Sequence, residues 1–227
     1  MIDIHSHIIP FVDDGSVDLE SSLALIEDAI KQGVEHIILT PHYRSRFRLP
    51  KEKINSEFEK FSQIVKDKGL NVNLYLGQEI FMTYGVKELL EQNAVCTMAN
   101  SKYVLVEFDT ENERDIVSDV YELVLLGYIP IVAHLERYFY ADYKTAFEIK
   151  QVGGLIQVNA DSIVKKGRIR RKVKRLFERA LVDFVASDVH VGRRNYMADS
   201  MKIVRKKFGN DAVRAVYYEN ARKILKG

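Results

Sequence analysis

The sequence has little or none of several features that mark particular classes of protein. It contains one cysteine, Cys96, and no tryptophan. A single cysteine cannot form an internal disulfide, which agrees with a reducing compartment. With 34 Lys and Arg against 32 Asp and Glu, neither sign of charge predominates. The composition therefore favours neither nucleic acid nor a membrane surface as a partner.

Long apolar stretches are also missing. The longest nearly uninterrupted one runs from Leu123 to Ala133, which is too short to cross a bilayer. No basic-then-apolar leader opens the chain, since Asp3, His5 and His7 stand where a signal peptide would be. These absences predict a cytoplasmic protein without membrane insertion.

What the sequence does contain is an alternation of short apolar runs and helical patterns. Strands are expected at residues 2–5, 34–40, 72–76, 103–108, 129–133, 155–158 and 184–186. Helices are expected near residues 19–32, 54–65, 86–92, 115–126, 144–151, 170–180, 197–208 and 211–225. Continuous apolar strands are typical of a parallel sheet covered on both faces. Because no Gly/Ser/Pro-rich linker interrupts the pattern, it predicts one α/β domain over residues 1–227, either a doubly wound sheet or a (β/α) barrel.

Histidine, carboxylate and amide residues stand where the expected strands end. The set is His5, His7, His42, Glu79, Glu107, His134, Asn159, Asp188 and His190. The carboxyl ends of parallel barrel strands share one face, so these side chains should converge there. The sixth histidine, His36, lies early in its strand and is interpreted as structural. Without cations the converging groups would repel or stay unsatisfied, and they are numerous enough for two or three metal ions.

Two short segments have the spacing of metal ligands. In His5-Ser6-His7 the histidines are two apart, so in an extended segment both face the same side. Asp188-Val189-His190 repeats this arrangement near the other end of the chain. Nitrogen and oxygen donors without thiolate favour Mn, Fe or Zn over Mg or Ca.

In order along the whole chain, the motifs around these residues resemble the polymerase and histidinol phosphatase (PHP) superfamily. The motifs are Asp3-Ile4-His5-Ser6-His7, Asp13-Asp14-Gly15, Thr40-Pro41-His42, Gly77-Gln78-Glu79, Val106-Glu107-Phe108, Ala133-His134-Leu135-Glu136-Arg137-Tyr138 and Ala186-Ser187-Asp188-Val189-His190. Within the superfamily the chain is most similar to the bacterial manganese-dependent protein-tyrosine phosphatases of capsule and exopolysaccharide loci.

The resemblance implies a distorted, TIM-like (β/α)7 barrel and a trinuclear Mn²⁺ centre. Its implied metal ligands are His5, His7, His42, Glu79, Glu107, His134, Asp188 and His190, with Glu79 bridging two ions. Arg137 matches an arginine that holds phosphate, and Arg193 is chosen for the second such arginine over the adjacent Arg194. Asp14 is expected to orient water or to donate a proton to the leaving group.

The implied reaction is hydrolysis of phosphotyrosine by metal-activated hydroxide. The implied substrate is the tail of an autophosphorylating bacterial tyrosine kinase that controls capsule or exopolysaccharide synthesis, and no nucleic-acid partner is expected. The alternatives are a histidinol-phosphate phosphatase, a PHP-type metal-dependent nuclease and a catalytically silent metal-binding scaffold. A cysteine-dependent phosphatase is disfavoured, because the residue six positions after Cys96 is Lys102 and not arginine.

Several residues have a structural interpretation beside the functional one. Asp13 and Asp14 could simply shape the turn before Gly15, and Asn159 is expected to cap a helix rather than to assist a ligand. The basic run at residues 165–175 is interpreted as a solvated helix face, with docking of an acidic phosphorylated tail as the alternative. Some aromatic residues after strand ends could wall a cleft: Tyr43, Phe47, Phe81, Tyr84, Tyr138 and Tyr140.

Overall fold

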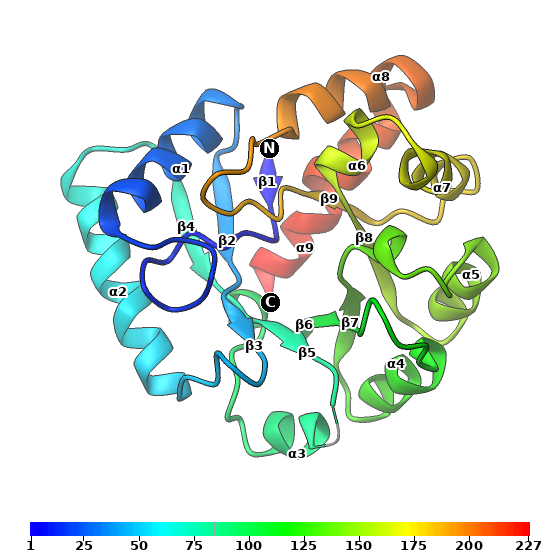
Figure 1. Cartoon of the computed structure of the whole chain (residues 1–227), viewed down its shortest axis with the longest axis horizontal. Coiled ribbons are helices and arrows are strands. Elements are labelled where there is room, and N and C mark those ends of the chain that lie inside the picture. Colours follow the sequence, from blue (N-terminus) through cyan, green and yellow to red (C-terminus); the bar gives the residue numbers. More distant parts are fainter. Residues whose placement is uncertain (84) are drawn as a thin grey trace.

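The computed structural model describes residues 1–83 and 85–227, so Tyr84 lies outside the described residues. Its strands are β1 Ile2–Asp3, β2 His36–Leu39, β3 His42–Tyr43, β4 Asn73–Leu76, β5 Glu79–Phe81, β6 Tyr103–Glu107, β7 Ile129–Val132, β8 Leu155–Asn159 and β9 Phe184–Ala186. All paired strands are parallel, and they curl into a ring with most helices outside it (Figure 1).

Two strand positions of this ring are interrupted. The strands pair in the orders β1-β2-β4 and β3-β5-β6-β7-β8-β9. Thr40 and Pro41 separate β2 from β3, which continues in the same direction. The ladder is interrupted at this point because proline has no N–H to donate to it. β5 likewise follows β4 after Gly77-Gln78. When each of these pairs is taken as one interrupted strand, the described residues form the predicted seven strands of the barrel.

The first and last strand positions are joined beyond their regular ends. Ser6 and Val189 form a parallel bridge, and the backbone N–H of His7 donates to the Val189 carbonyl at 3.0 Å. The N–H of Asp188 donates to the His5 carbonyl at 2.9 Å. This contact brings the first and last strands together at the same rim, and the predicted distorted barrel is confirmed.

The helices lie largely where the sequence predicts them. They are α1 Leu19–Lys31, α2 Lys51–Asp67, α3 Val86–Glu91, α4 Ile116–Leu125, α5 Tyr143–Gln151, α6 Ala160–Val164, α7 Arg168–Phe177, α8 Met197–Arg214 and α9 Asn220–Lys226, with short turns η1 Met98–Asn100, η2 Leu135–Arg137 and η3 Ala215–Glu219. Gly209, with φ of 85°, interrupts α8 between the two helices predicted there. The short α6 is not predicted by the sequence pattern. Within the described ranges, no helix combines the length and the apolar character needed to span a bilayer.

The C-terminal helix closes one end of the ring. A compact apolar cluster fills the interior, with Ile4, Ile38, Leu105, Ile131 and Phe184 among its buried residues. Ala221 and Ile224 of α9 belong to the same cluster, and α9 contacts β1 and η1. In Figure 1 this helix crosses the middle of the ring of strands. Because that end is filled with apolar side chains, polar chemistry is confined to the opposite end, where the strands terminate.

Candidate metal centre

The eight predicted ligands meet at the carboxyl ends of the strands. His5 and His7 follow β1, His42 begins β3, Glu79 begins β5, Glu107 ends β6, His134 follows β7, and Asp188 and His190 follow β9. All eight are buried. His36 lies apart from them, with its Nδ1 3.3 Å from the Tyr75 hydroxyl.

The carboxylate of Glu79 occupies the middle of the group. Its Oε1 lies 2.9 Å from His134 Nε2. Its Oε2 lies 2.8 Å from His42 Nδ1, 3.2 Å from His7 Nε2 and 3.3 Å from His5 Nε2. The two Nε2 atoms of His5 and His7 face each other at 3.1 Å, and Asp188 Oδ1 lies 3.6 and 3.5 Å from them. Nitrogen and oxygen atoms thus converge from five segments of the chain.

Hydrogen bonds behind the histidines orient their rings. His7 Nδ1 donates to Asp13 Oδ2 at 2.7 Å, and His190 Nδ1 donates to the Asp188 carbonyl at 3.0 Å. His134 Nδ1 lies 3.3 Å from the Tyr138 hydroxyl, which itself donates to the Ala133 carbonyl. A proton on Nδ1 leaves the Nε2 lone pair directed at the centre, which is the tautomer a metal ligand needs.

Gln157 of β8 performs the same task for His5 and was missed by the sequence analysis. Its side-chain oxygen accepts the backbone N–H of His134 at 2.7 Å, and His5 Nδ1 lies 3.2 Å from the same atom. A backbone N–H can only donate, so the atom is the amide oxygen and His5 must donate to it. The detectable signal was a pair of polar residues, Gln157 and Asn159, two apart in an otherwise apolar strand.

The expected capping role of Asn159 is wrong. Asn159 precedes α6, but its side chain makes no cap hydrogen bond. Its Nδ2 instead donates to Asp188 Oδ2 at 2.7 Å, and its Oδ1 accepts Gln157 Nε2 at 2.7 Å. The side chain points into the barrel end because strand geometry puts it on the same face as Gln157. Asn159 therefore orients a candidate ligand.

Asp13 both shapes the turn before Gly15 and supports a candidate metal ligand, so it has the structural and the functional role between which the sequence left the choice open. Its Oδ1 accepts the Gly15 N–H at 2.9 Å, as in a turn, while Oδ2 accepts from both His7 Nδ1 and the His42 N–H. Although burial alone would raise the pKa of Asp13, the charge and hydrogen bond of His7 lower it to about 2. Gly15 is required there, because a Cβ would lie 2.2 Å from the His7 carbonyl oxygen.

Two candidate ligands have a backbone conformation that is unfavourable for non-glycine residues. His134 has a φ of 32° and Asp188 a φ of 49°. Such conformations cost about 1 to 3 kcal/mol each and persist only when the surroundings enforce them. Each residue lies two positions after the end of a strand, β7 or β9. The turn there directs the side chain back across the mouth of the barrel, which is the end of the barrel where the strands terminate.

The buried carboxylates strongly influence one another. Burial alone would raise the pKa of Glu79, but the positive charge of His5 and a hydrogen bond from His134 hold it well below its usual value. Burial and the neighbouring negative charge of Glu79 raise the pKa of Glu107 to about 8. Burial and the charge of His7 lower the pKa of His190 to about 4, although Asp188 opposes them. Cations would relieve this repulsion and keep both glutamates ionised.

Unpartnered buried atoms show that a divalent metal fits the site. His42 Nδ1, Glu79 Oε2 and Glu107 Oε2 are all buried without a hydrogen bond, although they belong to one cluster of potential ligands. The contact between His42 Nδ1 and Glu79 Oε2 is 2.8 Å but does not have hydrogen-bond geometry. Lone pairs that converge without a shared proton suit a metal ion, and the imidazole and carboxylate donors suit Mn, Fe or Zn.

The predicted arginines differ in their surroundings. Arg137, on η2, donates from Nη1 to Asp188 Oδ2 at 3.4 Å. Arg193 is exposed beside His190, and its charge contributes to lowering the pKa of His190. Arg194 is directed elsewhere, since its Nη2 donates to Asp199 Oδ2 at 2.7 Å and its guanidinium stacks on Tyr196.

Asp14 and Phe47 lie at the mouth of the barrel beside His42, whereas Tyr138 is buried in the interior. Asp14 lies at the mouth, with its Oδ1 3.5 Å from His42 Nε2. Phe47 also lies there, with its ring stacked against that of His42 at a centroid distance of 6.1 Å. Tyr138 is a buried support for His134, and Tyr140 donates to the Asp109 carbonyl at 2.7 Å. Phe47 and Tyr138 thus both make ring contacts with candidate ligands, but Tyr138 is fully buried against His134, whereas Phe47 is partly exposed beside His42.

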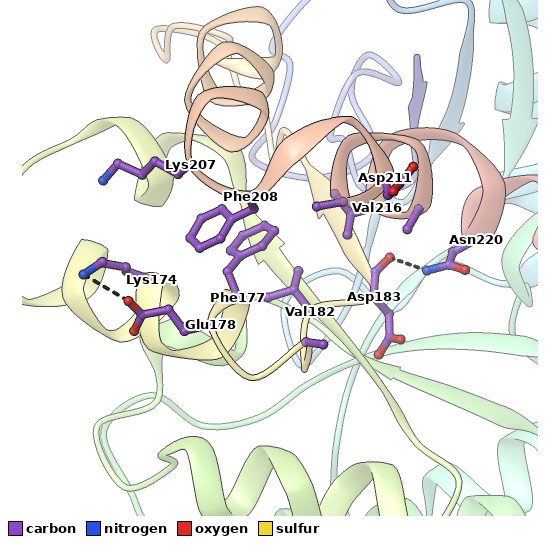
Figure 2. A pocket seen from close by; sticks show the side chains of 13 residues that line it. Lys174, Phe177, Glu178, Val182, Asp183, Lys207, Phe208, Asp211, Val216 and Asn220 are labelled. Carbon is purple, nitrogen blue, oxygen red and sulfur yellow. Dashed lines mark hydrogen bonds and ion pairs between the residues drawn. The ribbon is translucent and has the colours of Figure 1, made fainter.

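A groove between α7, α8 and η3 is a separate feature (Figure 2). It has a volume of about 860 Å³, and Phe177 and Phe208 stack in it at 4.9 Å. Its lysine Lys174 pairs with Glu178 at 3.0 Å. Its described lining residues include no histidine, so the groove does not share the chemistry of the barrel mouth.

The fold and the cluster together define a barrel protein with a candidate metal centre. The fold is shared by β-aspartyl dipeptidase from Fervidobacterium islandicum, with a TM-score of 0.65 and 14% identity over 100% of this chain and 72% of that one. At that identity the likeness concerns the fold alone.

The chain belongs to the CpsB/CapC family of capsular polysaccharide synthesis, whose model matches residues 1–226. It is 35% identical to the tyrosine-protein phosphatase CpsB of Streptococcus agalactiae, over 100% of this chain and 98% of that protein. It also matches a crystal structure from work on YwqE of Bacillus subtilis and CpsB of Streptococcus pneumoniae, described as unique metal-dependent tyrosine phosphatases. That match has a TM-score of 0.92 and 29% identity over 100% of this chain and 94% of the other. The predicted family is confirmed.

Proposed function

We propose that this protein is a metal-dependent protein-tyrosine phosphatase whose metal ligands are the eight residues of the barrel mouth: His5, His7, His42, Glu79, Glu107, His134, Asp188 and His190. The observation that carries the proposal is the convergence of buried, partly unpartnered nitrogen and oxygen atoms on Glu79. The family membership supports it, and the sequence prediction of a metal-dependent tyrosine phosphatase is confirmed at the level of the family.

We assign two or three ions to the centre, with Mn²⁺ as the expected metal and Fe or Zn as alternatives. The candidate groups are His5 with His7 and Asp188, His5 with Glu79 and His134, His42 with Glu79 and Glu107, and His7 with His42 and His190. His5, His7, His42 and Glu79 each belong to two of these groups. Of these four, Glu79 alone offers two oxygens, with Oε1 near His134 and Oε2 near His42, which supports a bridging role. When bound, the ions would activate water as the nucleophile and neutralise charge on the phosphoryl oxygens.

Arg137 and Arg193 are the proposed phosphate-binding residues. The Arg137 side chain is 41% exposed and hydrogen-bonded to Asp188, so its guanidinium reaches both the centre and the solvent. Arg193 is preferred to Arg194 because Arg194 is paired with Asp199. Guanidinium groups bind phosphoryl oxygens through forked, charge-assisted hydrogen bonds.

Asp14 is proposed to act at the mouth on water or on the leaving group. Its side chain is 50% exposed, and its Oδ1 lies 3.5 Å from His42 Nε2 and 4.0 Å from His190 Nε2. From this position it could orient water or donate a proton to the departing phenolate. Phenolate is a comparatively good leaving group, so the reaction does not require a strong general acid.

The proposed substrate is phosphotyrosine on the tail of an autophosphorylating bacterial tyrosine kinase that controls capsule or exopolysaccharide synthesis. The capsular role of the family supports this context. The ring of Phe47 beside His42 offers an apolar surface for a phenyl group. We further propose that residues 1–227 act as one domain, because Ser6 bridges to Val189 and α9 packs against β1.

The proposed function is tested by comparing three substrates: a phosphotyrosine peptide, histidinol phosphate and single-stranded DNA. With Mn²⁺ we expect rapid release of phosphate from the peptide, and we expect a strong chelator to abolish it. The near-neutral composition, with 34 basic and 32 acidic residues, favours the peptide over DNA. Preferential turnover of histidinol phosphate would support the main alternative, and chelator-sensitive cutting of DNA would support a nuclease.

Cys96 is expected to be dispensable for catalysis. It is buried, burial raises the pKa of its thiol to about 11, and its backbone N–H donates to Gln78 Oε1 at 2.7 Å. A protonated, enclosed thiol is a poor nucleophile. Cys96→Ser should therefore keep near-wild-type turnover, and iodoacetamide should have little effect. Loss of activity on alkylation, together with indifference to chelator, would assign the reaction to the thiol instead.

A further inference from the structure

A further arginine, Arg44, lies at the mouth in the segment between β3 and α2. Its Nη2 donates to Asp14 Oδ2 at 3.2 Å, and its Nη1 lies 3.8 Å from Glu107 Oε2. Its guanidinium lies 5.8 Å from the ring centre of Phe47. The side chain is 34% exposed, so it stands between the buried cluster and the solvent.

Arg44 and Arg137 have matching environments on two sides of the centre. Each donates one hydrogen bond to a carboxylate at the mouth, Arg44 to Asp14 and Arg137 to Asp188. Around the ring of described strands, Arg44 follows the second strand position (β2 with β3) and Arg137 follows the fifth (β7), so the two side chains approach the centre from different sides. Among the described residues Arg44 uses one of its five N–H donors in a hydrogen bond, which leaves others for a ligand.

Phe47 restrains Arg44 in this position. Its ring contacts the guanidinium and also stacks on His42, at a centroid distance of 6.1 Å. A cation held against an aromatic face loses less conformational freedom when it binds a ligand. The arrangement therefore prepares the guanidinium for an anion at the mouth.

We propose that Arg44 directly contacts the phosphoryl group of the substrate from a different side than Arg137. The proposal rests on the proposed phosphatase function and adds a substrate-binding residue to it. A phosphoryl dianion offers three non-bridging oxygens, so two arginines on different sides can bind different oxygens. The hydrogen bond to Asp14 need not break, because other donors of Arg44 remain for the phosphoryl group.

The test compares Arg44→Ala and Arg44→Lys with the control Arg46→Ala in Mn²⁺-loaded protein. Arg46 lies on the same segment and is exposed, with no ion pair within the described part of the chain. We expect Arg44→Ala to weaken binding of inorganic phosphate, measured by titration calorimetry, by roughly 10- to 100-fold. The kcat/KM of Arg44→Ala for the phosphotyrosine peptide should fall to a similar degree, while its metal content should be unchanged. Arg44→Lys should recover part of the lost phosphate affinity and part of the lost kcat/KM. Arg46→Ala should behave as wild type.

Two outcomes would overturn the proposal. Equal phosphate affinity of Arg44→Ala and wild type would show that Arg44 does not contact the phosphoryl group. An activity loss that disappears in an Asp14→Asn background would show that Arg44 acts only by holding Asp14. Phosphate affinity is measured without turnover. Failure of wild-type protein to hydrolyse the peptide would therefore count against the proposed function, while the affinity comparison would still decide the role of Arg44.

Discussion

Exchange of Glu79 for glutamine should lower phosphatase activity by at least about 10³-fold, because loss of the carboxylate proposed to bridge two ions would remove several kcal/mol of charge stabilisation. Glutamine keeps the size of the side chain but cannot supply two anionic oxygens. In the structure those oxygens lie within 3.3 Å of nitrogen atoms of His134, His42, His7 and His5. Metal content measured by mass spectrometry should fall together with activity.

The matched control is Glu59→Gln, which removes an exposed carboxylate on α2. It should leave both metal content and turnover at wild-type values. Circular dichroism should show the same helical content for both variants, because the apolar interior and α9 do not depend on the mouth. A Glu79→Gln protein with full metal content and full activity would refute the proposed centre.

The convergence of the eight candidate ligands could be predicted because it depends on a simple geometric rule. The carboxyl ends of parallel barrel strands share one face, so a histidine or carboxylate just after a strand is directed to that face. His5, His42 and His134 are far apart in sequence, yet each follows or begins a strand and reaches the same mouth. The rule does not require knowledge of how the strands are ordered.

The interactions that orient these ligands could not be predicted in the same way. His5 and Gln157 are 152 positions apart, and their contact depends on the closed ring rather than on local spacing. Asn159 has the sequence context of a helix cap, but the side-chain alternation of β8 turns it towards Asp188. Tertiary structure therefore decided between two locally reasonable interpretations.

The interruptions between β2 and β3 and between β4 and β5 could not be predicted from the local sequence pattern either. The apolar run at residues 34–40 predicts a strand, and β2 occupies His36–Leu39 within it, but the pattern does not predict the short strand β3 that follows at His42–Tyr43. The break allows His42 to pair opposite Glu79 in a second sheet. A conventional uninterrupted strand would continue the first ladder, so the distortion itself brings these two candidate ligands side by side.

Substitution of Arg137 by alanine separates phosphate recognition from stability. Arg137 lies three residues after His134 on η2, and its guanidinium reaches Asp188 Oδ2 at 3.4 Å. If it binds the phosphoryl group, Arg137→Ala should cost about 2 to 4 kcal/mol of transition-state stabilisation, or roughly 30- to 10³-fold in kcat/KM. Arg137→Lys should recover only part, because an ammonium keeps the charge but lacks the planar fork.

Metal content and melting temperature of Arg137→Ala should barely change, because its side chain is 41% exposed and lies outside the apolar clusters. Inorganic phosphate should inhibit the variant less than it inhibits wild type. Arg194→Ala is the matched control, since Arg194 pairs with Asp199 and stacks on Tyr196. It should leave kcat/KM nearly unchanged, whereas Arg193→Ala should resemble Arg137→Ala. An Arg137→Ala protein that melts early but keeps full activity per folded molecule would show that Arg137 only holds η2 in place, and phosphate binding would then fall to Arg193 and Arg44.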